Sequence, residues 1–142
     1  MFSTIVVGTD GSDTAAMAVT MAAQIARQNA ATLHLLSVSR LAAGVGGGGL
    51  ASGDPVGGDA LLKLAADRML EEVAREFESL DVVTHTESGS PATAIVRYAD
   101  EIGADLIVVG SKGMQGKRRI IGSVPNTVAH NAGCHVLIVK TT

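Results

Sequence analysis

Short apolar runs recur along this chain and alternate with longer stretches in which apolar residues repeat at helical spacing. The short runs are rich in Val, Ile, Leu and Thr and are bounded by Gly, Asp or Asn, which is typical of β-strands. Five strands are predicted in this way: Thr4–Gly8, Thr32–Val38, Val82–Glu87, Asp105–Gly110 and His135–Lys140. The last two are apolar almost throughout, as expected for strands that are covered on both faces of a parallel sheet.

The longer stretches predict four helices: about Thr14–Asn29, about Asp59–Leu80, about Pro91–Ile102 and about Ser123–Asn131. Ser12 or Asp13 is expected to cap the first helix, and Ser90 followed by Pro91 marks the start of the third. The stripes expected to face the sheet are Ala15, Val19, Ala22, Ala23 and Ala26 in the first helix, and Leu61, Leu64, Ala65, Met69, Val73 and Phe77 in the second. The regular alternation of strands and helices predicts one doubly wound parallel α/β domain over residues 1–142, with right-handed crossovers.

Glycine is frequent, with 17 in 142 residues, and eight of these fall within Gly44–Gly58. Such a segment is typical of a flexible loop, which is predicted at about residues 40–58. Two interpretations fit this loop: a mobile insertion without a role, or a lid or partner-recognition segment.

Composition and charge exclude several classes of function. Only three residues are aromatic, which argues against binding of single-stranded nucleic acid by base stacking, and a net charge of −3 argues against a duplex-binding surface. No apolar stretch is long enough to span a membrane, and no basic segment precedes the first strand as in a signal peptide. With Cys134 as the only cysteine, we expect a soluble cytoplasmic protein without nucleic-acid or membrane partners.

The loop after the fourth strand carries the clearest candidate chemistry, because ligands of doubly wound sheets bind beyond the carboxyl ends of the strands. Glycines allow close backbone approach to a ligand and anion-binding turns of successive N–H groups, and the start of a helix favours a phosphate. The glycines concerned are Gly110, Gly113, Gly116 and Gly122, and the cations among them are Lys112, Lys117, Arg118 and Arg119. A phosphate site and a solvated cationic face both fit this loop. The G-x-x-x-x-G-K-[ST] motif is absent, and no G-x-G-x-x-G motif follows the first strand.

Four sequence blocks in order resemble the universal stress protein family across essentially the whole chain. They are the N-terminal IVVGTDGS, ADLIVVGSKG, the pattern Gly110-x2-Gly113-x8-Gly122-Ser123 and the final HVLIVK. The resemblance implies an adenine-nucleotide alpha-hydrolase-like fold with strand order 3-2-1-4-5. It also implies a nucleotide site, usually for ATP, between the first and fourth strands.

Carried over position by position, the resemblance implies three groups of binding residues. Those at the adenine and ribose are Gly8, Thr9, Asp10 and Val38; those at the ribose and phosphates are Val109, Gly110, Ser111 and Gly113; those closing on the phosphates are Gly122, Ser123 and Val124. The residue types agree, because a carboxylate accepts hydrogen bonds from ribose hydroxyls or an adenine amino group, and valines form apolar walls. A turn or helix-capping role is the alternative for Asp10.

One departure from the family pattern concerns the ligand. Eight residues separate Gly113 from Gly122, where the ATP-binding pattern usually has nine. The chain also resembles a branch of the family that prefers cyclic AMP, through GTDGSD, AAQIA, GSVP and the VLIV…TT ending. ATP, alone or with Mg²⁺, is therefore the first expected ligand, and AMP or cyclic AMP is the alternative.

We expect a stress-related nucleotide sensor or regulator rather than an enzyme. The four histidines are scattered singly, no metal-ligand set is evident, and no catalytic residue is assigned. Slow hydrolysis of ATP has no identifiable catalyst in the sequence. The apolar final strand is expected at a sheet edge, where it would pair in a homodimer. A dimeric interaction module without bound nucleotide is a further alternative.

Overall fold

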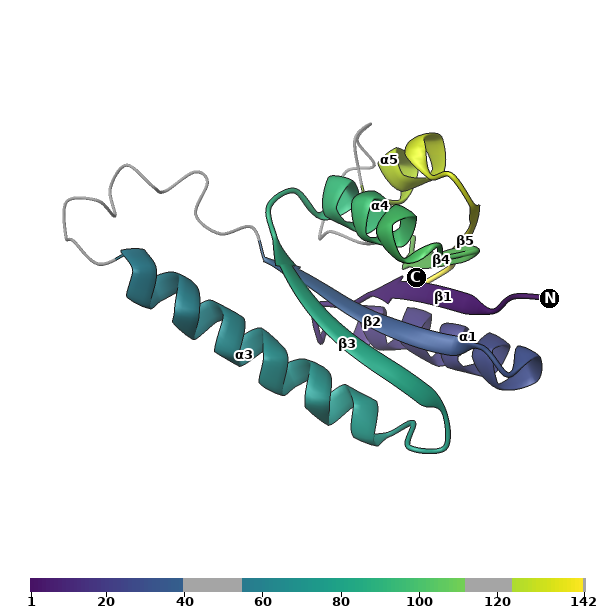
Figure 1. Cartoon of the computed structure of the whole chain (residues 1–142), viewed down its shortest axis with the longest axis horizontal. Coiled ribbons are helices and arrows are strands. Elements are labelled where there is room, and N and C mark those ends of the chain that lie inside the picture. The colour runs from purple at the N-terminus through teal and green to yellow at the C-terminus, as the bar shows by residue number, and fades with distance from the viewer. Residues whose placement is uncertain (40–54, 112–123, 142) are drawn as a thin grey trace.

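The fold, described here from a computed structural model, covers residues 1–39, 55–111 and 124–141. The elements in chain order are β1 (Thr4–Gly8), α1 (Asp13–Asn29), β2 (Thr32–Ser39), α3 (Pro55–Arg75), β3 (Asp81–Ser88), α4 (Pro91–Ile102), β4 (Leu106–Gly110), α5 (Val124–Asn131) and β5 (His135–Val139). The five strands are parallel and pair in the order β3-β2-β1-β4-β5. The doubly wound fold and the sheet order implied by the family resemblance are confirmed (Figure 1).

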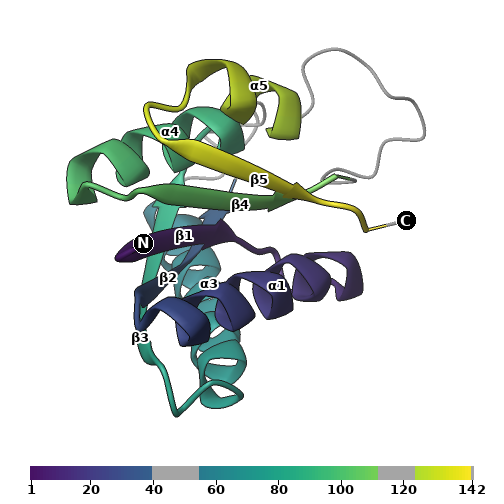
Figure 2. The same ribbon diagram turned by 90° about the vertical axis from the view of Figure 1, so that its right-hand side faces the viewer.

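The helices form two layers, with α1 and α3 on one face of the sheet and α4 and α5 on the other (Figure 2). Side chains of β1 alternate between two cores, since successive residues of a strand point to opposite faces. Ile5 and Val7 pack into the core beneath α1 and α3, and Val6 into the core beneath α4. All three are fully buried, which explains the continuous apolar pattern of the strand.

The two edge strands are less covered than the centre of the sheet. β4 is buried over Leu106–Val109, as its sequence predicts. The same prediction is wrong for β5, because this strand lies at the sheet edge and leaves Ile138 43% exposed. The apolar pattern of β5 therefore marks an accessible edge rather than a doubly covered strand.

The residues at which α1 and α4 begin and end are mostly those that favour helix ends. The Oγ of Ser12 accepts a hydrogen bond from the N–H of Ala15 (3.2 Å), so Ser12 is the N-cap of α1. Pro91 begins α4 and Gly103 ends it in the left-handed conformation (φ 69°). α1 also ends in this conformation, but at an alanine, Ala30 (φ 54°, ψ 41°).

The helix α3 differs most from its prediction. It begins at Pro55, so Gly57 and Gly58 are helical, whereas the glycine content assigns them to a loop. Proline favours the first helical position, and this signal outweighs the two glycines. Residues 40–54 of the predicted loop lie outside the described part of the chain.

The apolar stripe of α3 is buried only in its second half. The N-terminal half of α3 extends beyond the sheet (Figure 1). Leu61 (68% exposed) and Leu64 (47% exposed) belong to this half of the helix, whereas Leu70, further along it, is fully buried. Helical spacing predicts which side chains share a face, but the length of the sheet decides which of them are covered. Beyond Arg75 the chain forms turns closed by hydrogen bonds such as that from Phe77 N–H to Ala74 O (2.9 Å), so the predicted helical end near residue 80 is also wrong.

Candidate functional site

A cavity of about 300 Å³ opens at the carboxyl ends of β1, β2 and β4. β1 lies between β2 and β4, and the chain crosses away from it in opposite directions toward the two halves of the sheet. This is the switch point at which doubly wound sheets bind their ligands.

Seven of the residues singled out in the sequence line this cavity: Gly8, Thr9, Asp10, Val38, Val109, Gly110 and Val124. Ser111 is not one of the lining residues. Its Oγ accepts a hydrogen bond from the N–H of Thr141 (3.1 Å), so it supports the wall from outside. Gly113, Gly122 and Ser123 lie outside the described residues, as do Gly116 and the cationic positions 112 and 117–119.

Seven further lining residues were not predicted from the sequence: Ser12, Thr14, Ala15, Leu36, Pro91, Ile95 and Thr141. Leu36 could have been predicted from the sequence, because it lies two residues before Val38 and therefore on the same face of β2. Pro91 and Ile95 of α4, and Thr141 after β5, lie at the cavity because the order of the strands in the sheet brings these distant parts of the chain together. No local pattern marks them as site residues.

Hydrogen bonds hold the turn after β1 in place. The N–H of Thr9 donates to the carbonyl of Leu36 (2.9 Å), and the Oγ1 of Thr9 accepts from Gly11 N–H (3.1 Å). The Oδ1 of Asp10 accepts from the N–H of Ser12 (2.9 Å), which confirms a turn role for this carboxylate. Asp10 is nevertheless one of the residues that line the cavity, so both interpretations of Asp10 fit the structure.

The beginnings of three helices meet the cavity. Thr14 and Ala15 belong to the first turn of α1, Pro91 begins α4, and Val124 begins α5. The N-terminal end of a helix carries partial positive charge and unpaired N–H groups, which favour anions. The convergence of three such ends favours a ligand with a negatively charged group.

The cavity wall has an apolar and a hydroxyl-bearing part. Leu36 and Val38 of β2, together with Pro91 and Ile95 of α4, form the apolar part. The hydroxyl-bearing part is supplied by Thr9, Ser12, Thr14 and Thr141. A flat apolar group linked to a polar, anionic group fits this division.

Small residues keep the cavity open at two strand ends. A Cβ on Gly8 would lie 3.2 Å from Ile95 Cδ1, and a Cβ on Gly110 would lie 3.0 Å from Thr141 Cγ2. Both contacts are tighter than ordinary van der Waals contacts, so any larger residue would displace the cavity wall.

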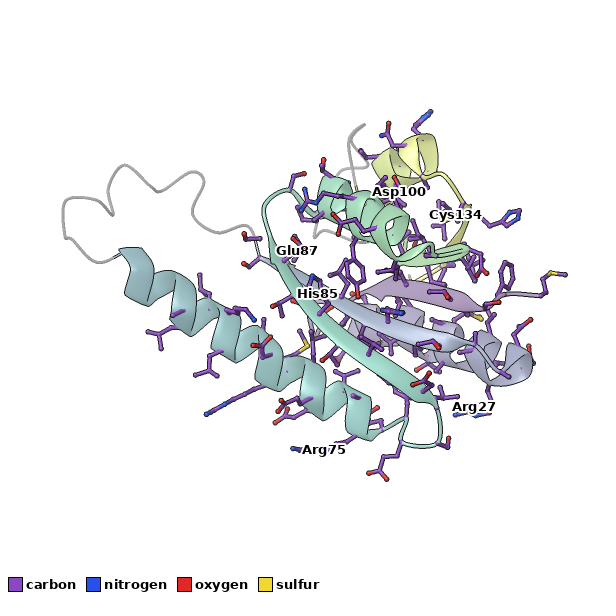
Figure 3. All side chains as sticks on the ribbon, viewed as in Figure 1. Arg27, Arg75, His85, Glu87, Asp100 and Cys134 are labelled. Atoms are coloured by element: carbon purple, nitrogen blue, oxygen red, sulfur yellow. The ribbon has the colours of Figure 1, made fainter. Side chains whose placement is uncertain are left out.

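A hydrogen-bonded cluster of His34, His85, Glu87, Arg97 and Tyr98 joins β2, β3 and α4 beside the cavity. The Nδ1 of His34 shares a hydrogen bond with the Tyr98 hydroxyl (2.9 Å), and the Tyr98 ring stacks on His85 (centroids 4.4 Å apart). The Nε2 of His85 and the Oε2 of Glu87 are 2.8 Å apart, and Arg97 donates to Oε1 of Glu87 (3.0 Å). Figure 3 shows His85 and Glu87 side by side on β3.

Several groups have shifted pKa values. The hydrogen bond from His85 lowers the pKa of Glu87, with a smaller contribution from Arg97. Burial lowers the pKa of His34 and raises that of Tyr98. Burial also raises the pKa of the Cys134 thiol, which disfavours the reactive thiolate form.

Two features are absent from residues 1–39, 55–111 and 124–141. No helix among them is long and apolar enough to cross a membrane. Within the same residues, no three His, Cys, Asp or Glu side chains are grouped so that they could hold a metal ion.

The fold and the position of the cavity define a doubly wound α/β protein with a cavity at its switch point. The family model of the universal stress protein family matches residues 1–140. Universal stress protein MJ0531 of Methanocaldococcus jannaschii is 37% identical over 143 residues, covering 99% of this chain and 83% of that protein. Universal stress protein Rv1636 of Mycobacterium tuberculosis is 36% identical over 148 residues, covering 99% and 98%. The chain therefore belongs to the universal stress protein family.

Solved structures support the same assignment. A universal stress protein in complex with cAMP is 33% identical, with a TM-score of 0.74 and coverage of 99% of this chain and 98% of that one. Protein MJ0577 is 26% identical, with a TM-score of 0.84 and coverage of 100% and 98%.

Proposed function

We propose that this universal stress protein binds an adenine nucleotide in the cavity at the carboxyl ends of β1, β2 and β4, and acts as a stress-related sensor or regulator. The observation that carries the proposal is the cavity itself, in which an apolar wall from β2 and α4 faces the beginnings of three helices. A related protein of similar fold that is bound to cAMP supports it.

Each part of the nucleotide has a matching part of the cavity. The purine lies between the apolar side chains of β2 and Val109, and no aromatic residue lines the described cavity. The Asp10 carboxylate accepts a hydrogen bond from a ribose hydroxyl or the adenine amino group. Gly113, Gly122 and Ser123 hold phosphates together with the helix beginnings, as the family resemblance implies.

ATP is the first proposed ligand and cAMP the second. The family pattern supports ATP, with or without Mg²⁺. The cAMP complex of the related structure favours the second ligand, as does the spacing of eight residues between Gly113 and Gly122. Calorimetric titration with Mg·ATP, AMP and cAMP separates the candidates. Mass spectrometry of the nucleotide released on denaturation identifies any ligand that is carried through purification.

A matched pair of variants tests the site. Val38→Asp places a carboxylate in the proposed purine wall, and we expect the affinity for the nucleotide to fall by about tenfold or more, because a charge in an apolar contact is costly. Val83→Asp introduces the same change at an exposed position of the edge strand β3 and leaves the affinity unchanged. If the wild-type protein binds no nucleotide, the proposed function is wrong.

We further propose binding rather than catalysis. Asp10 is the one titratable side chain among the described lining residues, and its Oδ1 is engaged by Ser12. General acid–base chemistry usually needs a second titratable group within reach. Bound ATP is expected to stay intact during prolonged incubation. Release of phosphate at a steady rate by the wild-type protein, but not by a Val38→Asp variant, would contradict this proposal.

A cytoplasmic location and a homodimer complete the proposal. β5 forms one edge of the sheet, and an exposed apolar edge is a template for pairing with another strand. Pairing of two copies through β5 about a two-fold axis would cover Ile138 on both. A dimeric interaction module without nucleotide predicts the same dimer, but no binding in the titrations.

A further inference from the structure

The segment that follows β5 forms part of the cavity wall. β5 pairs with β4 as far as Val139, opposite Gly110, and the ladder extends one step further through Ser111 N–H, which donates to Val139 O (2.8 Å). Two residues after Val139, Thr141 lines the cavity and is only 6% exposed. Figure 2 shows the end of this segment on the side of the sheet where α1 begins.

Hydrogen bonds to Ser111 help to hold Thr141 at this position, beside Gly110. The Oγ of Ser111 accepts from the N–H of Thr141 (3.1 Å) and lies 3.4 Å from its Oγ1. The missing side chain of Gly110 makes room for Thr141, whose Cγ2 would lie 3.0 Å from a Cβ at that position. The sequence suggested that Gly110 admits a ligand, whereas in the structure it admits the side chain of Thr141.

Thr141 lies on the polar side of the cavity. A Cβ on Gly110 would point to the same side as Thr141 and would lie 4.0 Å from Ala18 Cβ, about one turn after Thr14 and Ala15 in α1. Thr141 thus lies on the face of the sheet covered by α1. The start of α1 and its hydroxyl-bearing residues Ser12 and Thr14 line the same part of the cavity. The apolar wall of Leu36 and Val38 belongs to β2, on the other side of β1.

We propose that Thr141 is a ligand-selecting residue, whose hydroxyl donates a hydrogen bond to the phosphate group of the bound nucleotide. The inference rests on the proposed function. A threonine hydroxyl carries both donor and acceptor capacity, so it can bond to a phosphate oxygen while it remains near Ser111. Because Thr141 is buried at a fixed position, its hydroxyl is already oriented before the ligand binds, and less conformational entropy is lost on binding.

The experiment compares Thr141→Val, Thr141→Ser and the wild type in titrations with adenosine, AMP and cAMP. Valine keeps the shape and loses the hydroxyl, so we expect the affinity for AMP and cAMP to fall by about tenfold, as for other hydrogen bonds to charged groups. Adenosine lacks the phosphate, and its affinity should be unchanged. Serine restores the hydroxyl, and with it the affinity for AMP and cAMP.

Thr84→Val on the exposed edge strand β3 is the matched control and should bind all three ligands as the wild type does. Thermal unfolding of each variant shows that the fold is intact. Equal affinities of Thr141→Val and the wild type for AMP and cAMP would overturn the inference, and so would an equal loss for adenosine and AMP. Both results leave the proposed function standing, since that depends on whether the wild-type protein binds nucleotide.

Discussion

Ala30, at the end of α1, adopts a backbone conformation that suits glycine. Its φ of 54° lies in the left-handed region, where a Cβ is crowded by the following carbonyl. Neighbouring bonds hold the helix end: the Nδ2 of Asn29 donates to Ile25 O (2.9 Å), and its Oδ1 accepts from Phe2 N–H (3.2 Å). The surrounding structure thus imposes the conformation on the alanine.

Replacing Ala30 by glycine should stabilise the protein by about 0.5–1 kcal/mol, because relief of the left-handed conformation exceeds the entropy cost of glycine. Urea unfolding monitored by circular dichroism measures the change. Ala16→Gly is the matched control, since Ala16 is exposed within α1 and the same substitution there should destabilise by about 1 kcal/mol. Equal losses in both variants would contradict the prediction.

The close packing of Thr141 against Gly110 can be tested with single and double substitutions. Gly110→Ala should destabilise the protein by about 1–3 kcal/mol, because the new Cβ meets the Cγ2 of a side chain that Ser111 holds in place. Thr141→Ser removes that methyl group. In the double variant the cost of the alanine should therefore shrink, with a coupling of about 0.5 kcal/mol or more in a double-mutant cycle. Additive effects would show that the two residues do not compete for space.

At the scale of elements, the cluster of His34, His85, Glu87, Arg97 and Tyr98 attaches α4 to β2 and β3. Ile95 of α4, three residues before Tyr98, lines the cavity, so the same helix carries the cluster and part of the site. A change of protonation in the cluster therefore affects contacts of α4, the helix whose Ile95 forms part of the cavity wall.

Acidification should destabilise the protein in two windows. The folded-state pKa of His34 is lowered, so the unfolded chain binds the proton first, and stability is lost as the pH falls below the ordinary value of 6.5. The lowered pKa of Glu87 gives stability that is present above its ordinary value of 4.5 and is lost as the pH falls through the folded-state value.

The free energy of unfolding, measured with denaturant between about pH 7.5 and about pH 5.5, covers the pH range in which the contribution of His34 is expected. His34→Gln should flatten the pH dependence of the free energy of unfolding in this range. His130→Gln, at an exposed position of α5, is the control and should leave the dependence as in the wild type. An unchanged slope in His34→Gln would show that His34 does not contribute.

For the whole molecule, the exposed edge of β5 matters most. A homodimer through this edge predicts a mass of twice that of the chain in light scattering at micromolar concentration. Ile138→Lys should yield a monomer, because lysine on an edge strand opposes pairing. Val83→Lys on the opposite edge, β3, should leave the dimer intact. A monomeric wild-type protein at this concentration would refute the dimer.

Much of this molecule follows from the sequence alone. Within the described residues, apolar runs and helical spacing predicted the strands and helices in their order, because burial of one face is a local pattern that survives in any compact fold. A turn at Asp10 and an N-cap at Ser12 are among the alternatives that the local sequence offers, and the family resemblance supplied the cavity residues of β1 and β4. The family resemblance supplied the sheet order and, through it, the position of the site.

The tertiary structure decided the rest, because it depends on contacts between residues that are distant in the chain. The extent of the sheet leaves Leu61 and Leu64 exposed although they share an apolar stripe with buried residues. The pairing of β4 with β5 brings Thr141 over Gly110 and into the cavity, and the packing of α4 brings Ile95 there. Such positions carry no local signal, since only the closed fold places residues 30 or more apart in contact.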